Sequence, residues 1–333
     1  MKTPILALLL GLSLIFSARD VQAAGTFVAV STEIGSTNTE TLASGTTWTS
    51  FDNGTGYQLG FVAYNGSGLW CAVGAGVSSV SYYSTNNGAT WTSGGSVGQG
   101  SRVLAYGAGV FTVARGSPGF NATSSDCITW TPHSGYPIGT NPSQEIWDSA
   151  HSTFIGVAGT SSSLTSPDGA VWTSNFNVFP LTSMKWIASC AGTTITIQPS
   201  STSAFVSTNG VSWSAITLAD AAAWTGIACS DASHFTAIGS DGTTDYTSNG
   251  GTSWSTGSGL STLAPTSIAW NGAEYVAVAP STTAFGHSAD GHAWTVESSG
   301  AASLAAPALA ASTTAPAPAA SGAGNLTLIG VGQ

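Results

Sequence analysis

The sequence has little charge, and basic charge is the scarcest. Only 6% of its 333 residues are charged, with five Lys and Arg against fifteen Asp and Glu, whereas about a quarter of the residues in a typical soluble domain are charged. Without the first 23 residues, three basic residues (5 − 2) and 14 acidic ones (15 − 1) remain, a formal charge of −11. Nucleic-acid binding requires clusters of Lys and Arg that neutralise phosphates. The composition therefore excludes nucleic acid as a partner.

Long apolar runs are absent beyond the N-terminus. Lys2, the apolar stretch PILALLLGLSLIF and the small-residue site VQA have the pattern of a secretory signal peptide over residues 1–23, with cleavage predicted after Ala23. No later stretch reaches the ~18 apolar residues that a membrane span requires. The sequence predicts a secreted or periplasmic protein whose mature chain has no membrane span.

Helical periodicity is also missing from the mature sequence, and a different repeat takes its place. One phrase, a turn followed by a tryptophan strand, recurs as STNNGATWTS, TSPDGAVWTS, VSTNGVSWSA and HSADGHAWTV. The tryptophans are separated by 43, 39, 42, 41, 41 and 40 residues, and they are Trp48, Trp91, Trp130, Trp172, Trp213, Trp254 and Trp294. A period near 41 residues, sustained seven times, indicates a repeat architecture.

Each repeat contains four short strand patterns. In the last repeat they are TSIAW, YVAVA, AFGHS and HAWTV, with NGAE and ADG as turns. β-Branched and aromatic residues are typical of strands, and Gly, Asn and Asp of turns. Four strands in each of seven units predict an all-β fold, a seven-bladed β-propeller with four-stranded antiparallel blades.

The recurrent phrase has a structural explanation. An Asp or Asn side chain bonds to the backbone ahead and fixes the turn, the Gly permits a positive φ, and the Trp buries a large ring between blades. The alternative, seven ligand sites, is not needed to explain the pattern. The predicted turn-forming residues are Asn86, Asp126, Asp168, Asn209, Asn249 and Asp290, with Trp91, Trp130, Trp172, Trp213, Trp254 and Trp294 as their buried rings.

This phrase resembles the Asp-box, or BNR repeat, Ser-x-Asp-x-Gly-x-x-Trp, of bacterial sialidases and of many non-enzymatic propellers. Ser84 and Thr247 open copies with the full spacing, while Ser166, Ser207 and Ser288 open copies one residue shorter. Cys127 replaces the Gly in one copy. The resemblance covers residues 41–296 and implies a sialidase-like fold, with the motif on outer turns away from the usual ligand face. It carries no implication about activity.

Four cysteines in an exported chain favour disulfides, and four allow three pairings. Cys190 and Cys229 lie 39 residues apart at nearly equivalent places in consecutive repeats, which makes them the best candidate pair. No CxxC or HxxxH spacing is present and the five histidines are scattered, so the sequence predicts no metal site and no cofactor.

The domain organisation follows from the repeats. Residues 1–23 are the signal peptide, 24–296 the propeller repeats, and 297–324 an Ala/Pro/Ser/Thr-rich linker. The first unit lacks an inner strand, which the C-terminus can supply. Spacing favours APALAAS, but residues 325–333, NLTLIGVGQ, have the better strand pattern. We therefore predict that 325–333 closes the ring, with the linker looping out.

Catalysis is not predicted. A sialidase holds its substrate carboxylate with three arginines, and the mature chain has only Arg102 and Arg115, with Lys185 as a poor substitute. Another glycoside hydrolase would need two carboxylates flanking a cleft. The isolated acids of the repeats are the candidates, and a solvated turn residue is the simpler interpretation for each: Asp52, Glu145, Asp148, Asp220, Asp231, Asp241, Asp245 and Glu274.

The remaining function is binding. The longest blade-to-blade loops, residues 132–145 and 174–185, carry aromatic residues toward one face, and aromatic rings stack on sugars. The predicted ligand-binding residues are Trp186, Trp224, Tyr136, Phe179 and Trp147, although packing in the core would explain the same rings. The sequence thus predicts an exported, non-catalytic module for a glycan or cell-surface polymer. The alternatives are a scaffold for a protein partner and a hydrolase with an unrecognised carboxylate pair.

Overall fold

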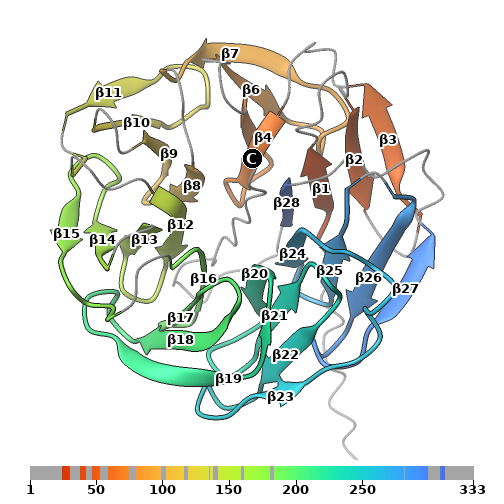
Figure 1. The fold of residues 1–333 in the computed structure, drawn as a ribbon. Helices are drawn as coiled ribbons and strands as arrows, with labels where there is room; N and C mark the ends of the chain where they lie inside the picture. Colours follow the sequence, from red (N-terminus) through yellow and green to blue (C-terminus); the bar gives the residue numbers. More distant parts are fainter. Residues whose placement is uncertain are drawn as a thin grey trace, which may run out of the picture.

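The computed structural model describes residues 25–30, 38–42, 47–52, 59–74, 80–98, 103–115, 119–134, 136–137, 142–158, 161–180, 184–280, 282–298 and 308–311. Seven four-stranded antiparallel sheets form a ring (Figure 1). The predicted fold class, a seven-bladed β-propeller, is therefore confirmed. The predicted signal peptide lies outside the described residues. Among the residues described, none forms a helix of the length and hydropathy that crossing a membrane requires.

The blades are numbered here in chain order, each from its inner to its outer strand. Blade 1 consists of β28 (Ala308–Ala311), β1 (Phe27–Val30), β2 (Asn38–Leu42) and β3 (Thr49–Asp52). Blade 2 consists of β4 (Leu59–Tyr64), β5 (Trp70–Gly74), β6 (Val80–Ser84) and β7 (Thr92–Ser96). Blade 3 consists of β8 (Val103–Gly107), β9 (Val110–Arg115), β10 (Phe120–Ser124) and β11 (Thr131–His133). Blade 4 consists of β12 (Pro142–Asp148), β13 (Thr153–Ala158), β14 (Ser163–Ser166) and β15 (Thr173–Asn175).

The last three blades follow the same order. Blade 5 consists of β16 (Trp186–Cys190), β17 (Thr193–Ile197), β18 (Ser201–Ser207) and β19 (Ser214–Ala222). Blade 6 consists of β20 (Trp224–Cys229), β21 (Phe235–Gly239), β22 (Thr244–Thr247) and β23 (Ser255–Thr256). Blade 7 consists of β24 (Ser267–Trp270), β25 (Tyr275–Val278), β26 (Ala284–Ser288) and β27 (Thr295–Ser298).

Antiparallel pairing gives the ring two distinct edges. The connections from first to second and from third to fourth strand lie on one edge, which we call the turn edge. The connections from second to third strand and from one blade to the next lie on the other, which we call the loop edge. The repeated tryptophan phrases join third to fourth strands, so they all lie on the turn edge. We call them the tryptophan turns, and in blades 2 to 7 they are residues 84–91, 124–130, 166–172, 207–213, 247–254 and 288–294.

A tryptophan turn is a closed hydrogen-bonding unit. In blade 4, Asp168 Oδ1 accepts from the amides of Ala170 and Val171 at 2.9 and 3.0 Å. The Ser166 hydroxyl accepts from the Gly169 amide at 2.8 Å, and Trp172 Nε1 donates to the Gly169 carbonyl at 3.0 Å. Burial opposes ionisation of Asp168, but the backbone donors, Val171 first, hold its pKa below the usual value. The turns of Asn209 and Asp290 repeat this pattern.

Each tryptophan turn also docks on the preceding blade. A Cβ on Gly210 would lie 2.8 Å from Ile155 of blade 4, so only glycine permits this approach. The carbonyls at the glycine position accept hydrogen bonds from side chains of the blade before, and the pairs are Ser81 with Cys127, Asn121 with Gly169, Ser163 with Gly210 and Thr236 with Gly291. The repeated phrase therefore joins blades as well as strands.

Both disulfides join neighbouring blades. Cys190 of β16 pairs with Cys229 of β20, as predicted, and Cys71 of β5 pairs with Cys127. Cys127 occupies the glycine position of its turn at φ 60°. The departure from the motif thus places a thiol where the turn meets blade 2, and a covalent bond replaces the close glycine contact.

The ring is closed by a different segment from the one predicted. As predicted, the C-terminal part completes blade 1, but β28 pairs with β1 from Phe27↔Ala311 to Val30↔Ala308. The predicted linker, 297–324, therefore contains the closing strand. The segment predicted to close the ring, 325–333, lies outside the described residues, and both sides of β1 are already paired. The position of a segment in the chain decides whether it becomes the inner strand, because tertiary context overrides intrinsic β propensity.

Candidate functional site

Trp186 and Trp224 begin the inner strands β16 and β20, as the sequence indicated, but neither ring is available to a ligand. They are 3% and 2% exposed. Trp186 Nε1 donates to the Trp224 carbonyl at 2.8 Å and Trp224 Nε1 to the Ser201 carbonyl at 2.8 Å. Because stacking requires an exposed face, the prediction that these two rings bind a ligand is corrected: they tie the inner ends of blades 5 and 6 together.

The other three predicted aromatic contacts also belong to the packing. Tyr136 is buried, and its hydroxyl donates to Glu145 Oε1 at 3.0 Å. Phe179 is buried against Phe205 and Trp213 of blade 5. Trp147 is partly buried, lies 4.8 Å from Phe154 and covers Gly107 of blade 3. These rings fill the seams beside blade 4, so the structure does not bring the five together as one binding surface.

The loop that follows β15 nevertheless presents one aromatic ring. Phe176 is 71% exposed, which is more than any other large apolar side chain in the described part of the protein. Three residues later, Phe179 anchors the same loop, with ring centroids 5.2 Å from those of Phe205 and Trp213. A buried ring and an exposed ring thus share one loop, and only the packing against blade 5 distinguishes them.

The Phe176 loop is held by hydrogen bonds on the loop edge. The Phe179 amide donates to the Ser161 carbonyl at 3.1 Å, and the Ser161 hydroxyl donates to Asn177 Oδ1 at 3.2 Å. Asn177 adopts φ 56°, which Asn tolerates better than most residues. Its Oδ1 accepts the Ser161 hydrogen bond, the residue as a whole is exposed, and it directly follows Phe176 in the chain. Phe176 and Asn177 together, which we call the Phe176 platform, combine an apolar face with hydrogen-bond donors.

Of the predicted candidate carboxylates, the structure brings Asp220 and Asp245 together. The Asp220 backbone amide donates to Asp245 Oδ2 at 2.9 Å. Burial first, and then the charge of Asp220, raise the pKa of Asp245 to about 6. Asp245 is fully buried. Asp245 is therefore inaccessible to a substrate, whereas the two carboxyls of a glycoside hydrolase flank an open cleft.

The other candidate acids are dispersed and engaged locally. Glu145 is fully buried beside Tyr136, and burial raises its pKa to about 8. Asp148, Asp231 and Asp241 accept hydrogen bonds from backbone amides within their own turns. Glu274 lies 3.5 Å from His287, which also approaches Glu297 at 3.4 Å. Within the described residues, no group of three His, Cys, Asp or Glu side chains could hold a metal ion.

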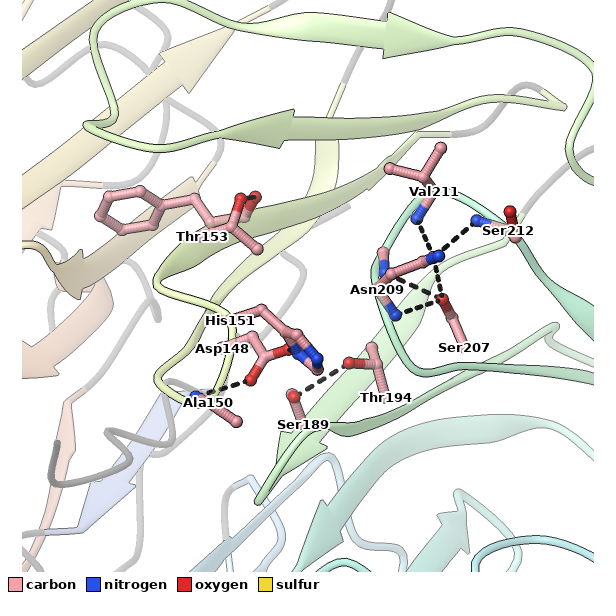
Figure 2. Close-up of polar contacts among 12 residues, drawn as sticks. Asp148, Ala150, His151, Thr153, Ser189, Thr194, Ser207, Asn209, Val211 and Ser212 are labelled. Carbon is pink, nitrogen blue, oxygen red and sulfur yellow. Dashed lines mark hydrogen bonds and ion pairs between the residues drawn. The ribbon is translucent and has the colours of Figure 1, made fainter. Parts of the chain in front are cut away.

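A polar cluster on the turn edge escaped the sequence-based prediction. His151 Nδ1 lies 2.6 Å from Asp148 Oδ2, with Asp148 buried and the His151 side chain 41% exposed. Figure 2 shows the imidazole extending toward Ser189 and Thr194 of blade 5, whose hydroxyls are 2.9 Å apart, near the Asn209 turn. A Cβ on Gly192 would lie 3.0 Å from His151 Cε1, so the ring touches the neighbouring blade.

The signal for this cluster was the spacing Asp-x-x-His. It occurs as DSAH at 148–151 and again as DASH at 231–234, where His234 Nδ1 approaches Asp231 Oδ2 at 2.8 Å. Both copies connect the first strand to the second. Recurrence at equivalent turns fits a structural turn that also closes the seam to the next blade.

Comparison with known proteins supports the fold class and goes no further. No protein-family model matches the sequence, and no match was found among curated proteins. Among solved structures, a functionally unknown protein from Desulfotomaculum acetoxidans has a TM-score of 0.66 at 10% identity, over 87% of this chain and 99% of that one. YCF48 bound to D1 peptide has a TM-score of 0.57 at 12% identity, over 82% of this chain and 94% of that one. A virginiamycin B lyase from Staphylococcus aureus with quinupristin has a TM-score of 0.61 at 9% identity, over 74% of this chain and 87% of that one.

These likenesses define the chain as a seven-bladed β-propeller. At such identities they show a shared fold and no shared activity, because the same fold carries binding proteins and a lyase.

Proposed function

We propose that the protein is an exported, non-catalytic propeller that binds carbohydrate through the Phe176 platform. The observation that carries the proposal is the exposure of Phe176, at 71%, on a loop held in place by a buried neighbour. An aromatic face accepts the apolar face of a sugar ring, and the adjacent Asn177 amide offers donors to its hydroxyls. The signal peptide predicted over residues 1–23 supports export.

The platform implies weak binding at a single site. Stacking on one ring contributes about 0.5–1.5 kcal/mol beyond the area it buries, and a total of about 4 kcal/mol corresponds to a millimolar Kd. A polymer that presents many equivalent sugars to protein molecules fixed on a surface would raise the effective affinity. A polysaccharide is thus a better ligand class than a free monosaccharide.

The absence of catalysis is supported by the acids and the arginines. Of Asp220 and Asp245, the two candidate acids that meet, Asp245 is fully buried, so the pair does not flank a cleft that admits a glycosidic bond. Three arginines for a sialidase clamp are not available in the mature sequence.

A glycan array probed with the mature protein tests the proposal. We expect binding to oligosaccharides by the wild type and its loss in Phe176→Ala. Val171→Ala is the matched control, because Val171 is another exposed apolar residue of blade 4 but lies on the turn edge. No binding to any glycan, or equal binding by wild type and Phe176→Ala, would contradict the proposal.

A protein-partner scaffold is the second candidate, and one observation favours it. Three of the exposed large apolar residues belong to the tryptophan turns of consecutive blades, namely Ile128, Val171 and Val211. YCF48, a propeller of similar fold, is bound to a peptide in its structure. For this candidate the two positions exchange roles: a new variant, Val171→Asp, should abolish capture of a protein partner purified from the native host, and Phe176→Ala should leave it unchanged.

A further inference from the structure

The tryptophan turns of blades 3, 4 and 5 carry exposed aliphatic side chains. Ile128, Val171 and Val211, which we call the aliphatic row, are 41%, 63% and 44% exposed. The three turns follow one another around the ring, since they lead into β11, β15 and β19, the outer strands of consecutive blades (Figure 1). Single exposed apolar residues are ordinary, whereas apolar side chains gathered at neighbouring exposed positions mark an interaction surface.

The remaining tryptophan turns show that the fold does not need aliphatic residues at these positions. In blades 2, 6 and 7 a backbone amide still donates to the Asx side chain of the turn. The corresponding positions there hold small, hydroxyl or imidazole side chains, namely Ala89, Thr90, Thr252, Ser253, His292 and Ala293. The aliphatic row is therefore dispensable for the turn, and its place on three consecutive blades points to a role outside the fold.

The backbone beneath the aliphatic row is fixed. The amides of Ile128, Val171 and Val211 each donate to the Asx side chain of their own turn, at 2.8, 3.0 and 2.9 Å. The three turns are also joined to the preceding blade by the contacts described above. A surface that is ordered before binding loses little conformational freedom when a partner docks on it.

The aliphatic row is accompanied by carboxylates that retain a free oxygen. Asp126 and Asp168 lie in the turns of Ile128 and Val171, and each uses Oδ1 to accept the turn hydrogen bonds. Their Oδ2 atoms accept no hydrogen bond from the described residues, and Asp168 is exposed while Asp126 is partly exposed. Asp is ionised at neutral pH, so the surface combines apolar side chains with negative charge.

Basic residues are missing from this side of the ring. Within the described residues, the connections of the turn edge contain no Lys or Arg. Arg115 ends β9 and Lys185 precedes β16, and both positions belong to the loop edge, while Arg102 lies outside the described residues. The carboxylates beside the aliphatic row thus have no cation of their own edge to pair with.

We propose that the aliphatic row docks a cationic segment of another protein, whose apolar side chains cover the row and whose Lys or Arg side chains pair with Asp126 and Asp168. This inference rests on the second candidate function, a scaffold for a protein partner, and names the chemistry of that partner. An uncharged apolar segment would cover the carboxylates without pairing them, which costs free energy. A second copy of this chain, with a formal charge of −11 in its mature form, would be repelled.

Three labelled synthetic peptides test the proposal by fluorescence anisotropy with the mature protein. One alternates Leu with Lys, one alternates Leu with Glu, and one alternates Ser with Lys. We expect the Leu–Lys peptide to bind and the Leu–Glu peptide not to bind. The Ser–Lys peptide should bind about tenfold more weakly or less, because it has the charges but no apolar side chains to bury.

Variants of the protein show whether the Leu–Lys peptide binds at the aliphatic row. The double variant Val171→Ser, Val211→Ser should weaken binding about tenfold or more. Asp168→Asn keeps an acceptor for the turn, as Asn209 does in blade 5, and should weaken binding more at low salt than at high salt. Asp290→Asn is the matched control: it makes the same change in blade 7, whose turn lacks the aliphatic side chains, and should bind as the wild type does.

The outcomes separate the partner's chemistry from the scaffold function. Binding of the Leu–Glu peptide by the wild type, lost in the double variant, would overturn the cationic partner and leave the scaffold function standing. Binding of no peptide, or Leu–Lys binding that the double variant keeps in full, would overturn both.

Discussion

At the scale of single residues, the repeated Asx and Trp positions act on the backbone. The Asp168 carboxylate accepts hydrogen bonds from two backbone amides. The Trp172 ring is buried, and its Nε1 donates to the Gly169 carbonyl of the same turn. These contacts explain why the chain repeats the phrase without any recourse to a ligand. Cys127 supports the same conclusion, because the one described turn without glycine has a disulfide at that position.

Stability should therefore respond differently to the two residues of one turn. Asp168→Ala removes two accepted hydrogen bonds and should cost about 1–2 kcal/mol of unfolding free energy. Trp172→Ala leaves a cavity between blades 3 and 4 and should cost about 3–5 kcal/mol. Urea denaturation of the three proteins measures both values. A Trp172→Ala protein as stable as the wild type would refute the structural role of the turn.

A second prediction at this scale concerns the buried acid Glu145. Burial raises its pKa to about 8, against a partial lowering by the Tyr136 hydroxyl. Because the folded pKa lies above the ordinary 4.5, its contribution to stability is complete below about pH 4.5 and is lost as the pH rises through about 8. Glu145→Gln keeps an acceptor for Tyr136 and does not titrate.

The unfolding free energy of Glu145→Gln, relative to that of the wild type, should consequently be higher at pH 9 than at pH 5. Urea titrations at both pH values measure the change. Parallel behaviour of the two proteins would show that Glu145 is ionised in the folded state.

At the scale of elements, ring closure depends on β28. Leu309 is fully buried, and β28 takes the inner position of blade 1 through four residue pairs with β1. A chain that ends after Ala311 should keep the melting temperature of the full chain to within a few degrees. A chain that ends before Ala308 leaves β1 as an unpaired inner edge and should aggregate or melt far lower. Thermal melts with size-exclusion chromatography compare the two truncations, and an intact ring without residues 308–311 would contradict the assignment.

The same strand shows how far sequence patterns reach. Strand number, blade number and the Cys190–Cys229 bridge followed from the 41-residue period, because the blades repeat the turn and its ring. The predicted burial of the ring is confirmed for Trp91, Trp172, Trp254 and Trp294, whereas Trp130 and Trp213 are only partly buried. The closing strand did not follow from composition: ALAA is a weak strand sequence, and pairing along all of β1 outweighs propensity. Spacing from Trp294 had pointed to the correct segment.

The candidate site was less predictable than the fold for a related reason. Phe176 and Phe179 occupy one loop, and nothing in the local sequence says which of them faces blade 5. Phe205 and Trp213, about 30 residues onward, make that choice. The rings of Trp186 and Trp224 were placed on the correct strands, but their burial depends on a seam that forms only when neighbouring blades pack. The Asp148–His151 turn had a local signal, the Asp-x-x-His spacing, but its contact with blade 5 could not be predicted from that spacing.

At the scale of the whole molecule, features shared by the blades contrast with the Phe176 platform. The tryptophan turns recur around the ring and hold it together, whereas the Phe176 platform is found on blade 4. A structural repeat with one binding loop predicts a single ligand per chain. Ligand sites built from the tryptophan turns would instead recur with the blades.

The stoichiometry of binding therefore distinguishes a site on the Phe176 platform from sites on the repeated tryptophan turns. Native mass spectrometry of the mature protein, titrated with the oligosaccharide that binds best on the array, counts the ligands on each chain. If the Phe176 platform is the binding site, each wild-type chain binds one ligand and Phe176→Ala binds none. A protein substituted at His292, in the blade 7 turn, still binds one. Several ligands per chain, retained by Phe176→Ala, would contradict this assignment of the site.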